Sequence, residues 1–273
     1  MLLYLSLGAL TGAIMALTGA GGGILAVPLL LFGAGMGMAQ AGPIALLAVG
    51  LAAALGAALG LRAHTVRYRA ALLVAAAGML LSPLGLWLAH QFDNRVLTGL
   101  FALVLAFVAY RTFRQAGRQG GASEAQAHEA PPPCVRNTLT GRFVWTAPCA
   151  RVLALSGALA GLLSGMLGVG GGFVMVPALR NYTDLPMDAA VATSLAVIAL
   201  VSGTGVVSSA LAGSLDVVAA LPFCAGALLG MMAGRTVAAR VAGAQLQRGF
   251  ATVAAVVAAG MLLKTVATLA AAG

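Results

Sequence analysis

Long apolar stretches that recur along the whole chain constrain its fold more than any other feature. Six of them are uninterrupted, at about 43–61, 70–90, 96–113, 189–212, 217–234 and 246–264. Each is close to the roughly 20 residues that a helix needs to cross a bilayer. Because 61% of the residues are hydrophobic and 8% are charged, polar surface cannot cover this chain as it covers a soluble protein. The alternation typical of a transmembrane barrel is absent from the sequence. We therefore expect an all-α polytopic membrane protein, embedded in a lipid bilayer.

Two further apolar segments, at about 2–36 and 152–180, are broken by glycine. The first contains TGAGGGILAVP at Thr18–Pro28, and the second contains LGVGGGFVMVP at Leu167–Pro177. In both, three adjacent glycines are followed five residues later by proline. An unpaired backbone group in hydrocarbon costs several kcal/mol, so such a break survives only where it is buried in protein or lines a wet cavity. Each segment is therefore expected to be a re-entrant or discontinuous helix beside a cavity.

The broken segments belong to a duplication. Shifting the sequence by 149 positions places Gly8–Leu30 on the second glycine-rich segment, with 11 identities in 23 positions. The same ungapped shift pairs Phe101 with Phe250. We therefore divide the chain into a first membrane repeat at 1–113, a central loop at 114–150 and a second membrane repeat at 151–273. The loop is polar and rich in glycine and proline, which predicts a flexible segment.

The distribution of basic residues bears on the orientation of the two repeats. If the broken segments re-enter, thirteen of the fifteen lysines and arginines lie on one side, and only Arg95 and Lys264 lie on the other. If they span, the division is ten against five. Because cytoplasmic loops carry an excess of lysine and arginine, the first arrangement is favoured. It predicts two inverted repeats, each with one glycine-broken segment and three transmembrane helices, and it places loops 62–69, 114–150 and 235–248 in the cytoplasm.

The glycine runs are the expected binding site. The half-helix that follows each run begins with unpaired amides and the positive end of its dipole, which favour an anion. Broken helices at corresponding places in two repeats are also typical of a transporter's substrate site. The alternatives are that the glycines only allow close helix packing and that the nearby hydroxyls bond within their own helices. The expected substrate-binding residues are Thr18, Gly21, Gly22, Gly23, Ser164, Gly170, Gly171, Gly172, Thr193, Ser194 and Ser202.

Other kinds of site have less support in the sequence. No serine in a nucleophile-like setting pairs with histidine, and no aspartate dyad falls within an apolar stretch, so we do not expect an enzyme. Cys134, Cys149 and His128 share the central loop without the close spacing of zinc ligands. The arginines are not interleaved with stacking aromatics, which argues against nucleic-acid binding. We expect no cofactor and no metal ion.

The glycine-rich segments ending in VP, with ATSLAVIALVSGTG at Ala192–Gly205 and GSLD at Gly213–Asp216, resemble the TauE/SafE sulfite exporter family. The resemblance covers essentially the whole chain outside the central loop. It implies a bacterial inner-membrane permease, expected to be an exporter, for small sulfur-containing anions such as sulfite or organosulfonates. An anion channel, a membrane subunit without carrier activity and a permease for another small anion remain alternatives. The first repeat departs from the pattern, because Ile44 and Ala45 stand where the second has Thr193 and Ser194.

Overall fold

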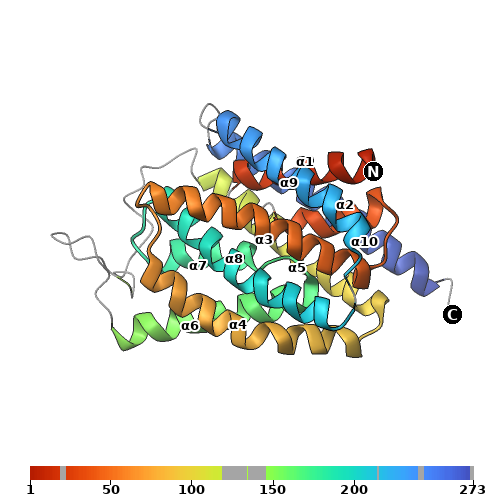
Figure 1. Ribbon diagram of the computed structural model, residues 1–273, viewed down its shortest axis with the longest axis horizontal. Coiled ribbons are helices and arrows are strands. Elements are labelled where there is room, and N and C mark those ends of the chain that lie inside the picture. The colour runs from red at the N-terminus through yellow and green to blue at the C-terminus, as the bar shows by residue number, and fades with distance from the viewer. Residues whose placement is uncertain (19–22, 119–133, 135–145, 214, 239–242, 271–273) are drawn as a thin grey trace.

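The computed structural model describes residues 1–18, 23–118, 134, 146–213, 215–238 and 243–270, which are almost entirely helical (Figure 1). Within these ranges the helices are α1 (Leu2–Thr18), α2 (Ala26–Gly33), α3 (Met38–Arg62), α4 (Tyr68–Gln91), α5 (Asn94–Arg118), α6 (Ala147–Leu167), α7 (Gly172–Tyr182), α8 (Met187–Leu211), α9 (Val217–Ala238) and α10 (Gly243–Ala270). Six of these described helices are long and apolar enough to cross a membrane, namely α3, α4, α5, α6, α8 and α9. The expectation of an all-α polytopic membrane protein is confirmed.

The sequence duplication reappears in the helix boundaries. Helices α3, α4 and α5 of the first half correspond to α8, α9 and α10 of the second. Their first residues are Met38 and Met187, Tyr68 and Val217, and Asn94 and Gly243, each pair separated by 149 positions. The three uninterrupted segments expected in each half are therefore present, with ends a few residues longer than the apolar stretches.

Each broken segment forms a helical hairpin with a long first arm and a short second arm, and whether it re-enters or spans the membrane stays a prediction. The 17 residues of α1 are followed by the 8 residues of α2. A methyl group on Gly33, at the end of α2, would lie 2.8 Å from Leu7 Cδ1 near the start of α1, so the two helices run in opposite directions. In the second half the arms are the 21 residues of α6 and the 11 residues of α7. The two hairpins enter the bundle from opposite ends (Figure 1).

The two halves pack together through reciprocal helix pairs. Helix α1 packs on α9, and its counterpart α6 packs on α4. Helices α3 and α8, which are counterparts, pack on each other, as do α5 and α10. A methyl group on Gly60 would lie 3.0 Å from Ala192 Cβ, and one on Gly205 would lie 3.1 Å from Leu46 Cδ1. Residues late in α3 lie against residues early in α8, and the reverse also holds, so these corresponding helices are antiparallel. Their orientation in a bilayer stays a prediction.

Glycines outside the two runs allow the close crossings between the halves. A methyl group on Gly8 would lie 2.1 Å from the carbonyl oxygen of Phe223, and one on Gly161 would lie 2.1 Å from that of Gly78. Such approaches of backbone to backbone are typical of small residues at membrane helix interfaces. The packing interpretation therefore holds at these positions.

The central loop is shorter than the sequence suggests. Helix α5 continues to Arg118, and α6 begins at Ala147, where Thr146 Oγ1 accepts a hydrogen bond from Cys149 N at 3.3 Å. This side-chain cap and the proline in the first turn explain the early start of the helix. Gly21, Gly22 and most of the loop lie outside the described residues.

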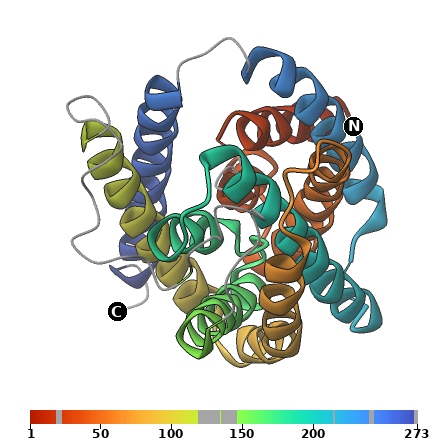
Figure 2. The same ribbon diagram turned by 90° about the vertical axis from the view of Figure 1, so that its left-hand side faces the viewer.

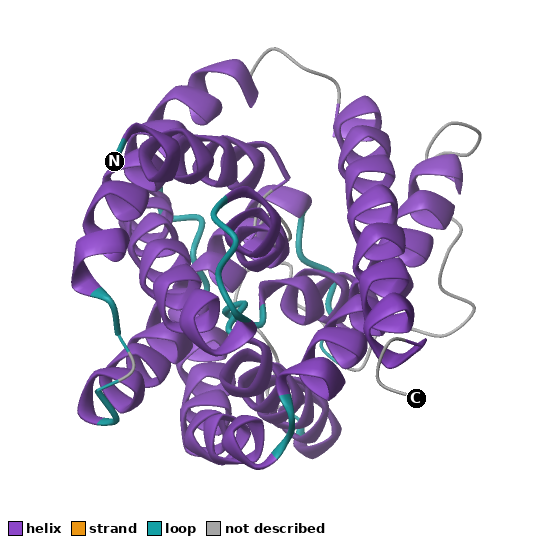
Figure 3. Cartoon of the chain, turned by 90° about the vertical axis from the view of Figure 1, so that its right-hand side faces the viewer, coloured by secondary structure: helices purple, strands orange, loops and turns teal. Residues whose placement is uncertain are grey.

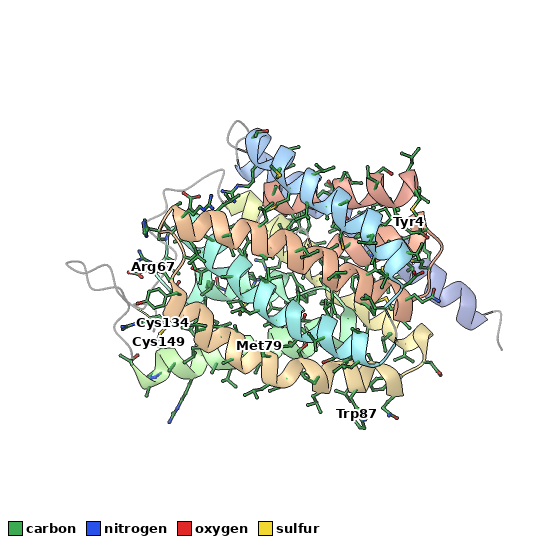
Figure 4. All side chains as sticks on the ribbon, viewed as in Figure 1. Tyr4, Arg67, Met79, Trp87, Cys134 and Cys149 are labelled. Atoms are coloured by element: carbon green, nitrogen blue, oxygen red, sulfur yellow. A yellow bond between two sulfur atoms is a disulfide. The ribbon has the colours of Figure 1, made fainter. Side chains whose placement is uncertain are left out.

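The two ends of the bundle differ in chemistry. Figure 4 shows Arg67, Cys134 and Cys149 at one end, and Tyr4 and Trp87 toward the other. The last turn of α3, with Arg62, and the last turn of α9, with Arg235, lie at the same end as Arg67. We call it the basic end. By the positive-inside rule this end is expected to face the cytoplasm.

Candidate functional site

The two glycine-rich breaks meet at the middle of α3. A methyl group on Gly23 would lie 3.0 Å from Val49 Cγ1 and 3.4 Å from the carbonyl oxygen of Val169. One on Gly170 would also lie 3.0 Å from Val49 Cγ1, and 2.9 Å from Ser202 Oγ. The described glycines Gly23 and Gly170, one from each run, thus lie against the same residue of α3.

The backbone of the second break requires glycine. The φ angles of Gly168, Gly170 and Gly171 are +72°, +77° and +68°, in the left-handed region that side chains disfavour. The amides of Val174 and Met175 donate to the carbonyl oxygen of Gly171, which is the N-cap of α7 and offers no side-chain cap. The N–H groups of the two residues that open α7, Gly172 and Phe173, precede these bonds and have no acceptor within the helix. They form a small donor group with the positive helix end behind it.

The glycines themselves are tightly packed. A methyl group on Gly168 would lie 2.4 Å from Gly42 Cα, and one on Gly171 would lie 2.6 Å from the carbonyl oxygen of Ala160. A neighbouring cavity is lined by Thr18 and Phe173, which are next to the two runs, and by none of the glycines that the structure describes. An anion that reaches the amides of α7 therefore approaches from the side of Phe173.

A cavity of about 660 Å³ lies between α5, α6 and α7. At the basic end it is lined by Arg111, Asn181 and Tyr182, and at its deep end by Thr18 and Phe173. Its walls are mostly apolar: Leu103, Val104, Phe107, Val108, Val152, Leu155, Leu159, Leu163, Val174, Val176, Pro177, Ala178 and Phe250. It extends from the basic end to the first turn of α7, and it is open along the α5–α6 side, where Leu103, Phe107, Leu155 and Leu159 are each more than half exposed.

The cavity carries positive charge. Arg111 is half-buried, and it makes no ion pair with the residues that the structure describes. Among the described residues, no aspartate or glutamate lines the cavity. A guanidinium with apolar surroundings and no carboxylate partner attracts anions and repels cations, and low-dielectric walls strengthen both effects.

The predicted hydroxyl ligands fall into two groups. Ser164 and Ser202 are fully buried, and neither Oγ has a hydrogen-bond partner in the described part of the chain. By contrast, Thr18 Oγ1 donates to Ile14 O at 2.7 Å and Ser194 Oγ donates to Val191 O at 2.8 Å, both within their own helices. Thr193 Oγ1 accepts from Arg67 N at 3.1 Å, between α8 and the loop before α4. Ser202 is the member that lies against the second glycine run.

Two residues of the cavity, Arg111 and Asn181, lie outside the motifs that the sequence shows. The sequence marks Arg111 only as a topology signal at the end of an apolar stretch. One signal for it does exist: 149 positions further along, the corresponding residue is Gly260, so the repeats differ in charge at this position. That difference places an arginine beside only one of the two hairpins.

Cys134 and Cys149, which the sequence gives no reason to connect, form a disulfide with a Cα–Cα distance of 5.0 Å. Cys134 N also donates to Tyr182 O at 3.2 Å, and Cys134 makes an isolated parallel bridge with Thr183. The pair therefore ties the end of α7 to the start of α6 beside the cavity mouth. No group of histidine, cysteine and acidic residues suited to a metal ion occurs among the described residues.

Comparison with known proteins gives one family. The family model described as "Sulfite exporter TauE/SafE" matches residues 4–261. A probable membrane transporter protein of Xylella fastidiosa strain 9a5c is 30% identical over 96% of this chain and 95% of its own length. The probable membrane transporter protein YunE of Bacillus subtilis is 25% identical over 85% of this chain and 86% of its own length. No solved structure matches.

Proposed function

Because the chain belongs to the TauE/SafE family of membrane transporters, we propose that it carries small sulfur-containing anions, such as sulfite or organosulfonates, across the bacterial inner membrane. The observation that carries this proposal is the cavity that extends to the uncapped start of α7, in which Arg111 is the one charged residue among the described lining residues. That charge favours an anion over a cation or a neutral solute. The family description supplies the sulfur chemistry.

The substrate site is placed where the amides of Gly172 and Phe173 begin α7. Two buried hydroxyls without partners, on Ser164 and Ser202, are close in sequence or in space to this turn. A buried hydroxyl without a partner costs free energy, so its retention suggests a ligand that supplies the missing hydrogen bond. Tetrahedral or pyramidal oxyanions offer several acceptor oxygens, which suit a ring of amide and hydroxyl donors.

Export is the favoured direction on energetic grounds. The membrane potential is worth about 2.3 kcal/mol per elementary charge per 100 mV. With the cytoplasm negative, a monoanion gains this free energy on leaving the cell and requires no coupling ion.

Counterflow in proteoliposomes tests the proposal. Vesicles loaded with unlabelled sulfite, thiosulfate, sulfate, sulfoacetate or taurine are diluted into a trace of labelled sulfite or sulfoacetate, and uptake is followed with time. We expect transient accumulation with at least one sulfur oxyanion or sulfonate inside. Accumulation driven only by cations or neutral solutes would refute the proposal.

The runner-up is an anion channel. The packed glycines at the deep end of the cavity favour a carrier, because they leave this route closed beyond Phe173. A carrier saturates and shows counterflow, whereas a channel shows neither at moderate concentrations. Efflux that rises linearly with anion concentration, together with single-channel currents, would establish the channel instead.

A further inference from the structure

The repeat symmetry of the fold is broken around the α5–α10 pair. Helix α10 packs against α1, whereas the corresponding helices α5 and α6 are separated by the cavity. Figure 2 shows α5 and α10 side by side along one flank of the molecule, and Figure 3 shows the same helical bundle from the opposite side. The pair therefore lies close to the first hairpin and stands away from the second.

The short arms of the two hairpins are also buried to different extents. In α7, Val174 and Val176 are half-buried and line the cavity. The corresponding residues of the first repeat are Leu25 and Val27, which are 1% and 0% exposed. The first short arm is thus covered where the second is open.

The residues at the basic end of the cavity have differently packed counterparts in the other repeat. Arg111 and Asn181 line the mouth, and 149 positions relate them to Gly260 and Phe32. A methyl group on Gly260 would lie 3.9 Å from Phe32 Cζ, so the Phe32 ring is close enough to touch a small side chain at position 260. At one end of the molecule this pair of repeat positions borders the cavity, and at the other end Phe32 lies over position 260.

We propose that the cavity is the open one of two alternating access routes, and that the α5–α10 pair closes it at Arg111 and Asn181 while opening the second at Phe32 and Gly260. This inference rests on the proposed transport function. Because the two halves share one fold, exchanging their conformations gives a second state built from equivalent contacts. The α5–α10 pair exchanges its packing on α1 for packing on α6. The glycine runs stay in place between the two routes.

Distance measurements between spin labels test the exchange. One pair of labels replaces Arg114 on α5 and Arg151 on α6, and the other replaces the corresponding exposed residues Leu263 on α10 and Leu2 on α1. Labels at Leu10 and Leu229, on the packed α1–α9 pair, serve as the control. The three native cysteines are replaced, and double electron–electron resonance is recorded in nanodiscs with and without sulfite or sulfoacetate.

We expect two distance populations for each of the two mobile pairs. The distances of the two pairs should change in opposite directions. A shorter Arg114–Arg151 distance accompanies a longer Leu2–Leu263 distance, and the control distance stays single. Single unchanged distances for both mobile pairs, or distances that lengthen together, would overturn the exchange. A shift of the populations by the anions tests the substrate, whereas two populations in the anion-free protein test the motion, so the two failures are distinguishable.

A reversible lock provides a second readout. The double variant Phe32→Cys/Gly260→Cys is oxidised to join α2 to α10, which holds the described state. We expect counterflow of whichever probe the unlocked protein transports to fall at least tenfold and to return on reduction. Transport that continues through the locked protein would contradict the exchange even if the substrate assignment is right.

Discussion

At the scale of single residues, two hydroxyls on α8 differ in whether another residue already satisfies them with a hydrogen bond. Ser202 Oγ is buried without a partner beside Gly170, whereas Thr193 Oγ1 accepts a hydrogen bond from Arg67 N. A hydrogen bond contributes about 1 kcal/mol net, and a buried group without a partner costs a similar amount. The two side chains should therefore respond in opposite ways to removal of the hydroxyl.

We predict that Ser202→Ala weakens anion transport without lowering stability, and that Thr193→Val lowers stability. Removing the hydroxyl of Ser202 abolishes no bond of the empty protein, so the melting temperature in detergent should stay level or rise. Loss of the Arg67–Thr193 bond should cost about 1 kcal/mol. Thermal melts and counterflow on both variants provide the measurement. If Ser202→Ala transports normally, this hydroxyl is not a ligand.

Gly171→Ala should destabilise the second hairpin. The residue has φ of +68°, and the added methyl group would lie 2.6 Å from the carbonyl oxygen of Ala160, which is backbone and cannot rotate away. Forcing such a conformation costs about 1–3 kcal/mol. Gly203→Ala on α8, where no atom lies within 4 Å, is the control and should be neutral or slightly stabilising. Equal melting temperatures for the two variants would contradict the steric account.

Arg111→Gln should raise the KM for anions on the basic side roughly tenfold at low salt, because the guanidinium concentrates anions at the mouth. The difference should shrink as ionic strength rises. Arg114→Gln is the matched control, since Arg114 lies on the same helix with its guanidinium 5.8 Å from the Tyr110 ring centre and does not line the cavity. A salt-independent loss would point to a structural role for Arg111.

At the scale of elements, the Cys134–Cys149 disulfide anchors the end of α7 at a place where the sequence predicts cytoplasm. Disulfides are rare in that compartment because glutathione and thioredoxin reduce them. We therefore predict that the pair is a dithiol in growing cells and forms the disulfide under oxidation. Alkylation by maleimide-polyethylene glycol before and after reduction measures the two forms. If the two cysteines of untreated cells react with the maleimide only after reduction, the disulfide is present in growing cells. The basic end would then lie outside the cytoplasm.

The elements also show what a sequence can predict and what it cannot. The breaks after α1 and before α7 follow from three adjacent glycines, and the pairing of α3 with α8 is consistent with the duplication. The separation of α5 from α6 could not be predicted, because the repeats share one pattern while the structure is asymmetric. The sequence predicts Thr193 as a ligand because of its hydroxyl and its place in the ATSLAVIALVSGTG motif, yet its bond to Arg67 depends on a loop 126 positions away. Long-range partners of this kind leave no periodic signal.

At the scale of the whole molecule, the antiparallel packing of α3 on α8 makes one test decisive for the predicted inverted repeats. Ala63 and Ala212 cap the ends of these helices, both are exposed, and 149 positions relate them. If both helices cross the membrane, the two residues emerge on opposite sides. Parallel repeats would place them on the same side.

We predict that a cysteine at Ala63 is labelled only from the cytoplasm and one at Ala212 only from the periplasm. The physical reason is the excess of arginine at the basic end, where Arg62 ends α3 and Arg235 lies in the last turn of α9. A membrane-impermeant maleimide, applied to intact cells and to inverted vesicles of a cysteine-free background, reports each side. Reversed labelling of both sites would keep the inverted arrangement but place the cavity with Arg111 on the periplasmic side, so that the described state would collect anions from outside. Labelling of both from one side would exclude the inverted repeats, and with them the exchange of access routes by the α5–α10 pair.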